Sequence, residues 1–151
     1  MRLEDELKSK GFQSEELKAM LNVLFTASWL HSKVSCSLKQ FGLSHEQFNV
    51  LRILKGQHPN PVAQKDILHR MIDRSSNLTR ILSKLKAKGL VLINRSETDR
   101  REYEIQLTQT ALDLLDSIAS SHDMNPKGAI GLTVSEAFHL NALLDKMREG
   151  E

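Results

Sequence analysis

The hydrophobic positions of the chain change their repeat at Gly89. Before this glycine, apolar residues recur at intervals of three and four, which is the repeat of a helix with one apolar face. They are Leu78, Ile81, Leu82 and Leu85. After it, residues 90–93 form an apolar run and residues 103–107 alternate apolar with polar side chains, as strands do. The pattern predicts a helix that ends at Gly89 and is followed by a two-stranded hairpin.

Polar residues stand at the start of this helix and along its other face. Asp73 or Ser75 can cap the helix by accepting hydrogen bonds from backbone N–H groups of the first turn. The side chains that could contact DNA are Ser75, Ser76, Asn77, Thr79, Arg80, Ser83 and Lys84. Such groups bind base edges and phosphates in a major groove, although an ordinary solvated helix surface has a similar composition.

The connection between the two predicted strands, residues 94–102, is polar and basic. It holds Arg95, Arg100 and Arg101 and no apolar residue, so we expect it to project into solvent. A helix with a polar face followed by a cationic hairpin is the arrangement of a winged helix-turn-helix. The fold class predicted is therefore mainly α, a winged helix-turn-helix with a two-stranded β-wing and, as the resemblance to a known family implies, a helical dimerisation platform.

A long helix is predicted from Ser14 to the neighbourhood of Gly42. Its apolar side chains occur on more than one face, so a partner subunit is the simplest cover for them. These side chains are Leu17, Met20, Leu21, Val23, Leu24, Phe25, Ala27, Trp29, Leu30, Val34 and Leu38. Residues 1–13, six of which are charged, are expected to form a loosely attached lead-in.

Capping boxes mark two further helix starts, Ser44 with Gln47 and Thr133 with Glu136. Between them, residues 64–71 are expected to form the first helix of the helix-turn-helix. The final helix is expected to bury a set of apolar side chains. They are Ala137, Leu140, Leu143, Leu144 and Met147.

These elements divide the chain into three parts. Residues 1–42 are the lead-in and the long dimerisation helix, residues 43–108 the DNA-binding domain, and residues 109–151 the C-terminal dimerisation helices, the first of them capped by Thr108. With 151 residues, the chain has room for one domain with an extension.

The distribution of charged residues along the chain is more informative than the net charge. The net charge is only +2. Between Arg70 and Arg101, however, nine lysines and arginines stand against three acidic residues, while the remainder has twelve against sixteen. One end of the molecule is therefore expected to face an anion. No apolar run approaches the roughly 20 residues of a membrane helix, and the first six residues are too acidic for a signal peptide, so a cytoplasmic protein without membrane contact is expected.

Several phrases of the chain closely resemble the MarR family of bacterial transcriptional regulators. They are Leu78-Thr79-Arg80, Lys88-Gly89-Leu90-Val91, Asp99-Arg100-Arg101, Leu107-Thr108 and, in a separate segment, Leu43-Ser44-x-x-Gln47-Phe48-x-Val50-Leu51. The chain departs from the family at Ala63, where a serine or threonine cap is usual, and at Ala111, where glycine is commoner.

The resemblance implies a homodimer that binds a pseudo-palindromic duplex, most often as a repressor, and is released by a small molecule or an oxidant. It also implies that Arg101 enters the minor groove, held in position by Asp99, with Arg100 and Arg95 near phosphates. An effector cavity between the dimerisation helices and the DNA-binding domain of residues 43–108, called the reader domain from here on, could be lined by Trp29 and His31.

The sequence gives less support to catalysis, metal binding or thiol chemistry. No nucleophile motif, phosphate-binding loop or carboxylate cluster indicates an enzyme, and no cofactor is expected. The six histidines show no compact ligand spacing, so no metal site is predicted. The single cysteine, Cys36, excludes an intrachain disulfide and is expected to be a small buried side chain. Two alternatives stay open: a winged-helix protein-interaction module, and a regulator that senses thiol oxidation at Cys36 or metal at the histidines.

Overall fold

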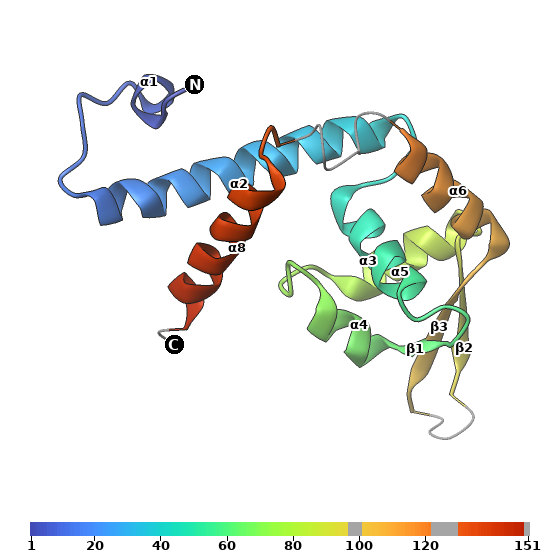
Figure 1. Cartoon of the computed structure of the whole chain (residues 1–151). Helices are drawn as coiled ribbons and strands as arrows, with labels where there is room; N and C mark the ends of the chain where they lie inside the picture. Colours follow the sequence, from blue (N-terminus) through green and yellow to red (C-terminus); the bar gives the residue numbers. More distant parts are fainter. Residues whose placement is uncertain (97–100, 122–129, 150–151) are drawn as a thin grey trace.

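The computed structural model describes residues 1–96, 101–121 and 130–149, with the chain arranged as a long helix that carries a compact domain at one end (Figure 1). The elements are α1 Leu3–Leu7, α2 Glu15–Lys39, α3 His45–Lys55, β1 Val62–Ala63, α4 Gln64–Arg70, α5 Leu78–Ala87, β2 Val91–Arg95, β3 Tyr103–Leu107, α6 Gln109–Ser120 and α8 Val134–Arg148. Among the described residues, no helix is both long and apolar enough to cross a membrane. Figure 1 shows α2 crossing the molecule, with α8 extending away from it.

Side-chain caps begin most of the helices at the predicted residues. The Ser14 and Thr108 hydroxyls accept hydrogen bonds from the backbone of α2 and α6. Both predicted capping boxes, at Ser44 of α3 and Thr133 of α8, are complete. Ala63 precedes α4 without a side-chain cap, because its methyl group cannot accept a hydrogen bond. Local sequence therefore fixes these helix starts.

The start of α5 differs from the prediction. Its N-cap is Asn77, whose Oδ1 accepts a hydrogen bond from the backbone N–H of Arg80 at 3.0 Å. Asp73 and Ser75 lie too far upstream to cap the helix, and they bond to each other instead. The predicted end is confirmed, because Gly89 has a φ of 68° that favours glycine.

The wing is an antiparallel hairpin with one strand more than predicted. β2 pairs with β3 in the register Val91↔Leu107 and Arg95↔Tyr103. On its other edge, β3 pairs with β1 through Val62↔Ile105, which gives the strand order β1-β3-β2. β1 has only two residues, too few to show an alternating pattern in the sequence.

One cluster of buried apolar side chains holds the reader domain together. It runs from Leu38 at the end of α2 to Ile118 in α6. The largest fully buried members are Leu38, Val50, Leu51, Leu54, Ile67, Leu85, Val91, Ile105 and Ile118. The predicted inner face of α5 belongs to this cluster, with Leu78, Leu82 and Leu85 all buried.

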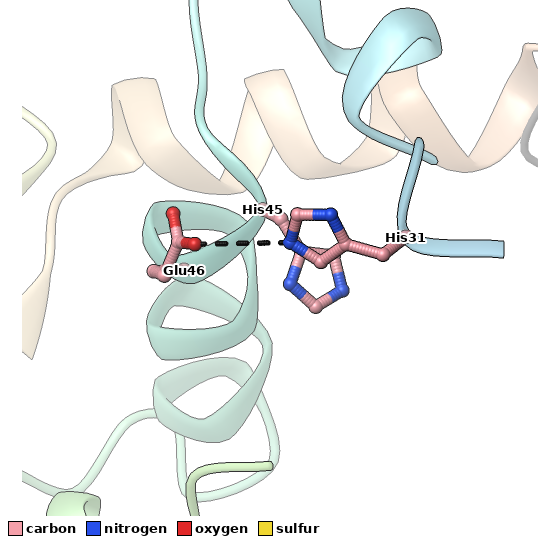
Figure 2. A group of neighbouring side chains, drawn as sticks. All are labelled: His31, His45 and Glu46. Carbon is pink, nitrogen blue, oxygen red and sulfur yellow. Dashed lines mark ion pairs between the residues drawn. The ribbon is translucent and has the colours of Figure 1, made fainter. Parts of the chain in front are cut away.

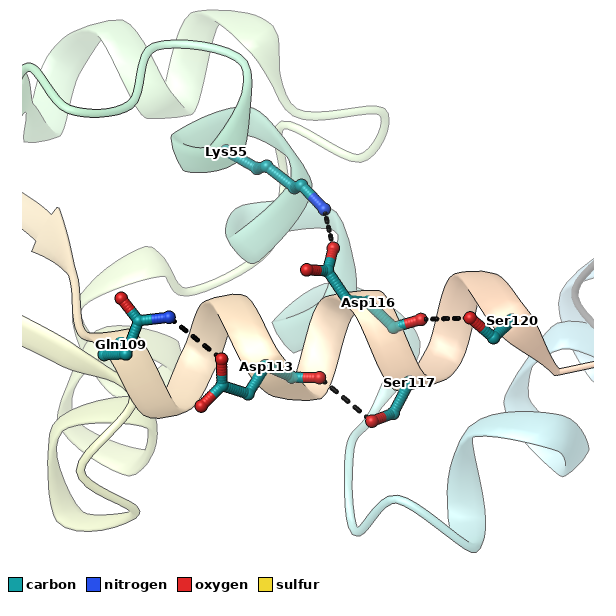
Figure 3. Close-up of polar contacts among 6 residues, drawn as sticks. All are labelled: Lys55, Gln109, Asp113, Asp116, Ser117 and Ser120. Atoms are coloured by element: carbon teal, nitrogen blue, oxygen red, sulfur yellow. Dashed lines mark hydrogen bonds and ion pairs between the residues drawn. The ribbon is translucent and has the colours of Figure 1, made fainter.

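Polar contacts join α3 to the helices on its two sides. From α2, His31 points toward His45 and Glu46 in the first turn of α3 (Figure 2). At the other end of α3, Lys55 Nζ lies 2.6 Å from Asp116 Oδ1 of α6 (Figure 3). α3 thus connects the long helix to the helix that leaves the wing.

The apolar side chains of α8 are exposed or only partly buried, contrary to the prediction that the final helix buries them. Leu140, Leu143 and Met147 are 43%, 62% and 55% exposed, and no residue of α8 is buried. On α2, Met20 and Leu24 are exposed in the same way. The prediction assumed that other side chains pack against this face of α8, and a single chain does not supply them.

The N-terminal lead-in is more ordered than expected. It forms the short helix α1, in which Leu3 is only 6% exposed. Glu4 of α1 forms an ion pair with Lys18 of α2, in which Glu4 Oε1 and Lys18 Nζ are 2.7 Å apart. This ion pair and the burial of Leu3 fasten α1 beside the long helix.

Leu85→Ala is expected to lower the free energy of unfolding by about 2–5 kcal/mol, because Leu85 is fully buried in the central cluster and its loss leaves a cavity. Urea denaturation at one fixed protein concentration measures the change. Leu92→Ala, on an exposed side chain of β2, is the control and should cost about 0.5 kcal/mol or less. Equal losses in the two variants would contradict the assigned core.

Candidate nucleic-acid interface

The polar face of α5 is exposed because the opposite face is anchored in the core. Thr79, Arg80, Ser83 and Lys84 all lie on the solvent side, while Leu82 and Leu85 point inward. The predicted reading residues of the helix therefore share one accessible surface. Their side chains combine hydroxyl groups with two cations, as a DNA-contacting helix requires.

The residues just before α5 form a hydrogen-bonded turn around Asp73. Its Oδ1 accepts bonds from the backbone N–H and the hydroxyl of Ser75, at 2.9 and 2.6 Å. Its Oδ2 accepts from the hydroxyl of Ser76 at 3.2 Å. The Ser75 hydroxyl, followed by its backbone N–H, holds the pKa of Asp73 below its usual value. The two serine hydroxyls donate to Asp73, so they keep acceptor lone pairs for other partners.

Neighbouring elements support this turn and the first turn of α5. Gln64 at the start of α4 donates a hydrogen bond to Thr79 Oγ1 at 3.2 Å. Asn49 of α3 accepts one from the backbone N–H of Ile72 at 3.1 Å. The position of the reading residues is therefore set by two other helices as well as by the core.

The base of the wing faces the start of α5. Arg101 lines a hollow of about 440 Å³ together with Ser76 and Thr79. Lys65 of α4 forms an ion pair with Glu102 at 2.5 Å, which ties the wing to the first helix of the helix-turn-helix. The structure thus brings predicted residues of the helix and the wing to one surface.

The other predicted wing residues are placed differently. Arg95 ends β2 opposite Tyr103 and is exposed. Asp99 and Arg100 lie outside the described residues. The predicted contact of Asp99 with Arg101 consequently stays a prediction.

Sequence reasoning missed several residues that share this surface. Gln64, Lys65, Arg74 and Tyr103 line the same hollow as Arg101. Arg74 stands next to the predicted serines, and its position could have suggested a phosphate contact. Nothing in the local pattern of α4 indicated that Gln64 and Lys65 face the wing, because that proximity arises from packing.

A second hollow, of about 390 Å³, lies on the other side of α5. It joins Arg80 and Lys84 to Ser44 and Glu46 at the start of α3. The pKa of Glu46 is lowered by a hydrogen bond from its own backbone N–H and by the Ser44 hydroxyl, with smaller effects of His45 and His31. A carboxylate therefore stands beside the cations of the reading helix.

Trp29 and His31, predicted to line one effector cavity, have different surroundings. Trp29 lies in a hollow of about 400 Å³ with Leu3, Phe25 and Ile130. His31 lies against α3, its ring centroid 4.7 Å from that of His45. Burial lowers the pKa of His45, and the adjacent His31 adds to this effect. The two predicted ligand residues are thus not brought together.

Cys36 is exposed on α2, contrary to the expectation of a buried side chain. The expectation rested on the usual burial of unpaired cysteine. The reader domain covers only the C-terminal end of α2, where Leu38 is buried and Cys36 two residues earlier is not.

Ser75→Ala is expected to raise the pKa of Asp73 toward the ordinary value of about 3.9, because the Ser75 hydroxyl is the main group that stabilises the carboxylate. A lowered pKa means that the turn is stabilised above the ordinary pKa and loses this contribution as the pH falls through the lowered value. Carboxyl ¹³C NMR titration measures the midpoint. Ser83→Ala, on α5 away from Asp73, is the control. The assignment fails if both variants titrate as the parent does.

Comparisons with known proteins agree with this geometry. Residues 32–118 match the family model described as transcriptional regulator SarA/Rot, which covers more than half of the chain. The HTH-type transcriptional regulator MgrA of Staphylococcus aureus is 28% identical over 109 residues, which are 72% of this chain and 72% of MgrA.

Solved structures show the same fold. A MarR-like transcription regulator from Bacillus cereus superposes with a TM-score of 0.76 at 21% identity, covering 88% of this chain and 95% of the other. A mutant MarR from E. coli, crystallised with operator DNA, superposes with a TM-score of 0.74 at 19% identity, covering 91% and 99%. The predicted winged helix fold is confirmed. The chain belongs to the SarA/Rot family of MarR-like winged helix-turn-helix proteins, and it is a DNA-binding transcriptional regulator and not an enzyme.

Proposed function

We propose that the chain is a homodimeric repressor that binds a pseudo-palindromic operator and is released by a small-molecule or oxidant signal. The observation that carries the DNA-binding part is the single surface formed by the start of α5 and the base of the wing, where Arg101 faces Ser76 and Thr79. One element of this surface can enter a major groove while the other reaches the adjacent minor groove.

The hydrogen bonds and exposure of the reading helix support the contacts that we propose for it. Ser75 and Ser76 offer acceptor lone pairs near the helix start, suited to the exocyclic amino groups of cytosine or adenine. Asn77 keeps its amide N–H₂ as a donor while its oxygen caps the helix. Thr79 and Ser83 offer hydroxyl groups, and Arg80 and Lys84 point outward to contact phosphates.

The wing would add minor-groove and phosphate contacts. We propose that Arg101 enters the minor groove, where the narrow groove of A·T-rich DNA strengthens the negative potential. Arg95 and Arg100 would contact phosphates, and Asp99 would orient Arg101. The ion pair of Lys65 with Glu102 supports this assignment, because it fixes the residue next to Arg101.

The homodimer is supported by the apolar surface that α2 and α8 leave open. A groove of about 460 Å³ between them is lined by Val23, Ala27, Leu30, Leu140 and Leu143, among other residues. Exposed apolar side chains gathered in this way are costly in water and mark an interface. Residues 43–108 would then bind DNA, residues 1–42 and 109–151 would supply the dimerisation helices, and α6 would link them through its buried side chains.

Repression and its release follow from a dimer of this kind. Two reading helices in successive major grooves exclude other proteins from that stretch of DNA. An effector shifts the dimer away from the DNA-bound spacing only if it binds the two arrangements with different affinity. The hollow at Trp29 has the volume of a small-molecule site, and Trp29 would line it, whereas His31 lies outside it. Because operator DNA of a bacterium lies in the cytoplasm, we propose that the protein acts there.

Arg101→Ala is expected to weaken binding to operator DNA and to lower the slope of log K against log salt by about one unit, because one groove contact that releases counterions is lost. The operator is first identified by selection from random duplexes at two salt concentrations, followed by sequencing. The control is Lys146→Ala, because Lys146 belongs to α8 and not to the reading surface. This variant should show the same slope of log K against log salt as the unsubstituted protein.

The selection also tests the function itself. An enriched inverted repeat with half-sites about one helical turn apart is expected. Weak, sequence-blind retention that disappears at the higher salt would overturn operator binding and favour a protein-interaction module.

Leu143→Glu is expected to convert the dimer into a monomer, because it places a charge in the apolar groove between α2 and α8. Light scattering during size-exclusion chromatography should show the mass fall from twice the chain mass to 17.1 kDa. Ile72→Glu, at a residue 78% exposed in the reader domain, is the control and should stay dimeric. A measured mass of 17.1 kDa for the unsubstituted protein in solution would refute the dimer.

A further inference from the structure

Three side chains of metal-ligand type converge where α2 meets α3. His31 comes from α2, while His45 and Glu46 come from the first turn of α3 (Figure 2). Each offers one ligand atom, and these atoms all lie within 4.8 Å of one another. The cluster lies apart from the hollow that Arg101 and the start of α5 share.

We propose that His31, His45 and Glu46 bind one divalent transition-metal ion of the zinc class. Imidazole nitrogen is a ligand that zinc, cobalt, nickel and copper accept, whereas calcium and magnesium take oxygen ligands. Two imidazoles and one carboxylate are also the protein ligands of many zinc sites that keep one position open. The chemistry of the three groups therefore selects this class of ion.

The present geometry needs only a small adjustment to hold such an ion. With zinc–ligand distances of about 2.0–2.1 Å, ligand atoms around a tetrahedral ion are about 3.4 Å apart. His31 Nε2 and Glu46 Oε1 are already 3.9 Å apart. Their side chains are 54% and 36% exposed, so both can rotate without displacing packed neighbours. Among the described residues no fourth histidine, cysteine or carboxylate joins the cluster, so water would complete the coordination.

The rings of His31 and His45 lie 4.7 Å apart between their centroids, and Nε2 of His31 faces the Glu46 carboxylate. One metal ion can accept electron pairs from both rings and the carboxylate together. It would also join two helices, the long helix and the helix that begins the reader domain.

The position of Glu46 couples this site to the reading helix, a step that rests on the proposed function. Glu46 lines the hollow that contains Arg80 and Lys84. Without metal, its carboxylate attracts these cations and opposes phosphate. Coordination converts a local charge of about −1 into about +1, since both rings stay neutral. Metal should therefore strengthen DNA binding about two- to fivefold, the scale of an exposed charge interaction.

Titration of the full, metal-free chain with Co(II) tests the site without DNA. The visible absorption bands of coordinated cobalt should saturate at one ion per chain, and Zn(II) should displace them. His31→Gln, His45→Gln and Glu46→Gln should each weaken binding at least about tenfold. His69→Gln, at an exposed histidine of α4, is the matched control and should bind as the parent does. Far-UV circular dichroism verifies folding, and His31 and Glu46 are exposed enough for their variants to fold.

The outcomes are distinct. Absence of cobalt binding, or equal binding by His31→Gln and His69→Gln, overturns the metal site. DNA affinity measured with and without Zn(II) tests the coupling, and an affinity that zinc leaves unchanged overturns the coupling alone. Failure of the metal-free protein to bind DNA would count against the proposed function and would leave the cobalt result standing.

Discussion

The buried cluster between Leu38 and Ile118 is the constraint on which the rest of the molecule depends. It holds α5 through Leu82 and Leu85 and the wing through Ile105, so the helix and the hairpin pack on one core. The residues that match the SarA/Rot family, 32–118, are nearly the same stretch. What the family shares is thus the part of the chain that one core holds rigid.

Around this core, hydrogen bonds between polar groups hold the side chains of the candidate interface in position without any ligand. Asp73 holds two serines, Asn77 holds the first turn of α5, and Gln64 holds Thr79. Such mutual support lowers the entropy that ordering these groups on DNA would otherwise cost. Lys88 is similar: it donates to the carbonyl of Gly42 and to Gln47, so it fastens the end of α5 to the start of α3.

Local rules predicted most of the fold, and they placed the candidate reading residues on the exposed face of α5. Helix starts depend on a few adjacent residues, and Ser14, Ser44, Thr108 and Thr133 were read correctly for that reason. The two strands of the hairpin followed from the apolar run at residues 90–93 and from the alternation at residues 103–107.

What the sequence did not reveal depends on distance along the chain or on another chain. β1 exists only because β3 offers an edge, and its two residues carry no pattern of their own. His31 meets His45 and Glu46 only after the connection between α2 and α3 reverses the chain. The burial predicted for α8 was wrong for a single chain, since an amphipathic pattern indicates that a face needs cover without indicating what covers it.

In the proposed dimer, the exposed apolar side chains of α2 and α8 would make operator occupancy depend on how fast the chain is synthesised. If two copies cover these surfaces for each other, the pairing is governed by mass action. Where chains are dilute relative to the dissociation constant of the pair, the concentration of dimer rises as the square of the chain concentration. A twofold rise in synthesis would then raise occupancy of an unsaturated operator about fourfold, a steep response that requires no effector.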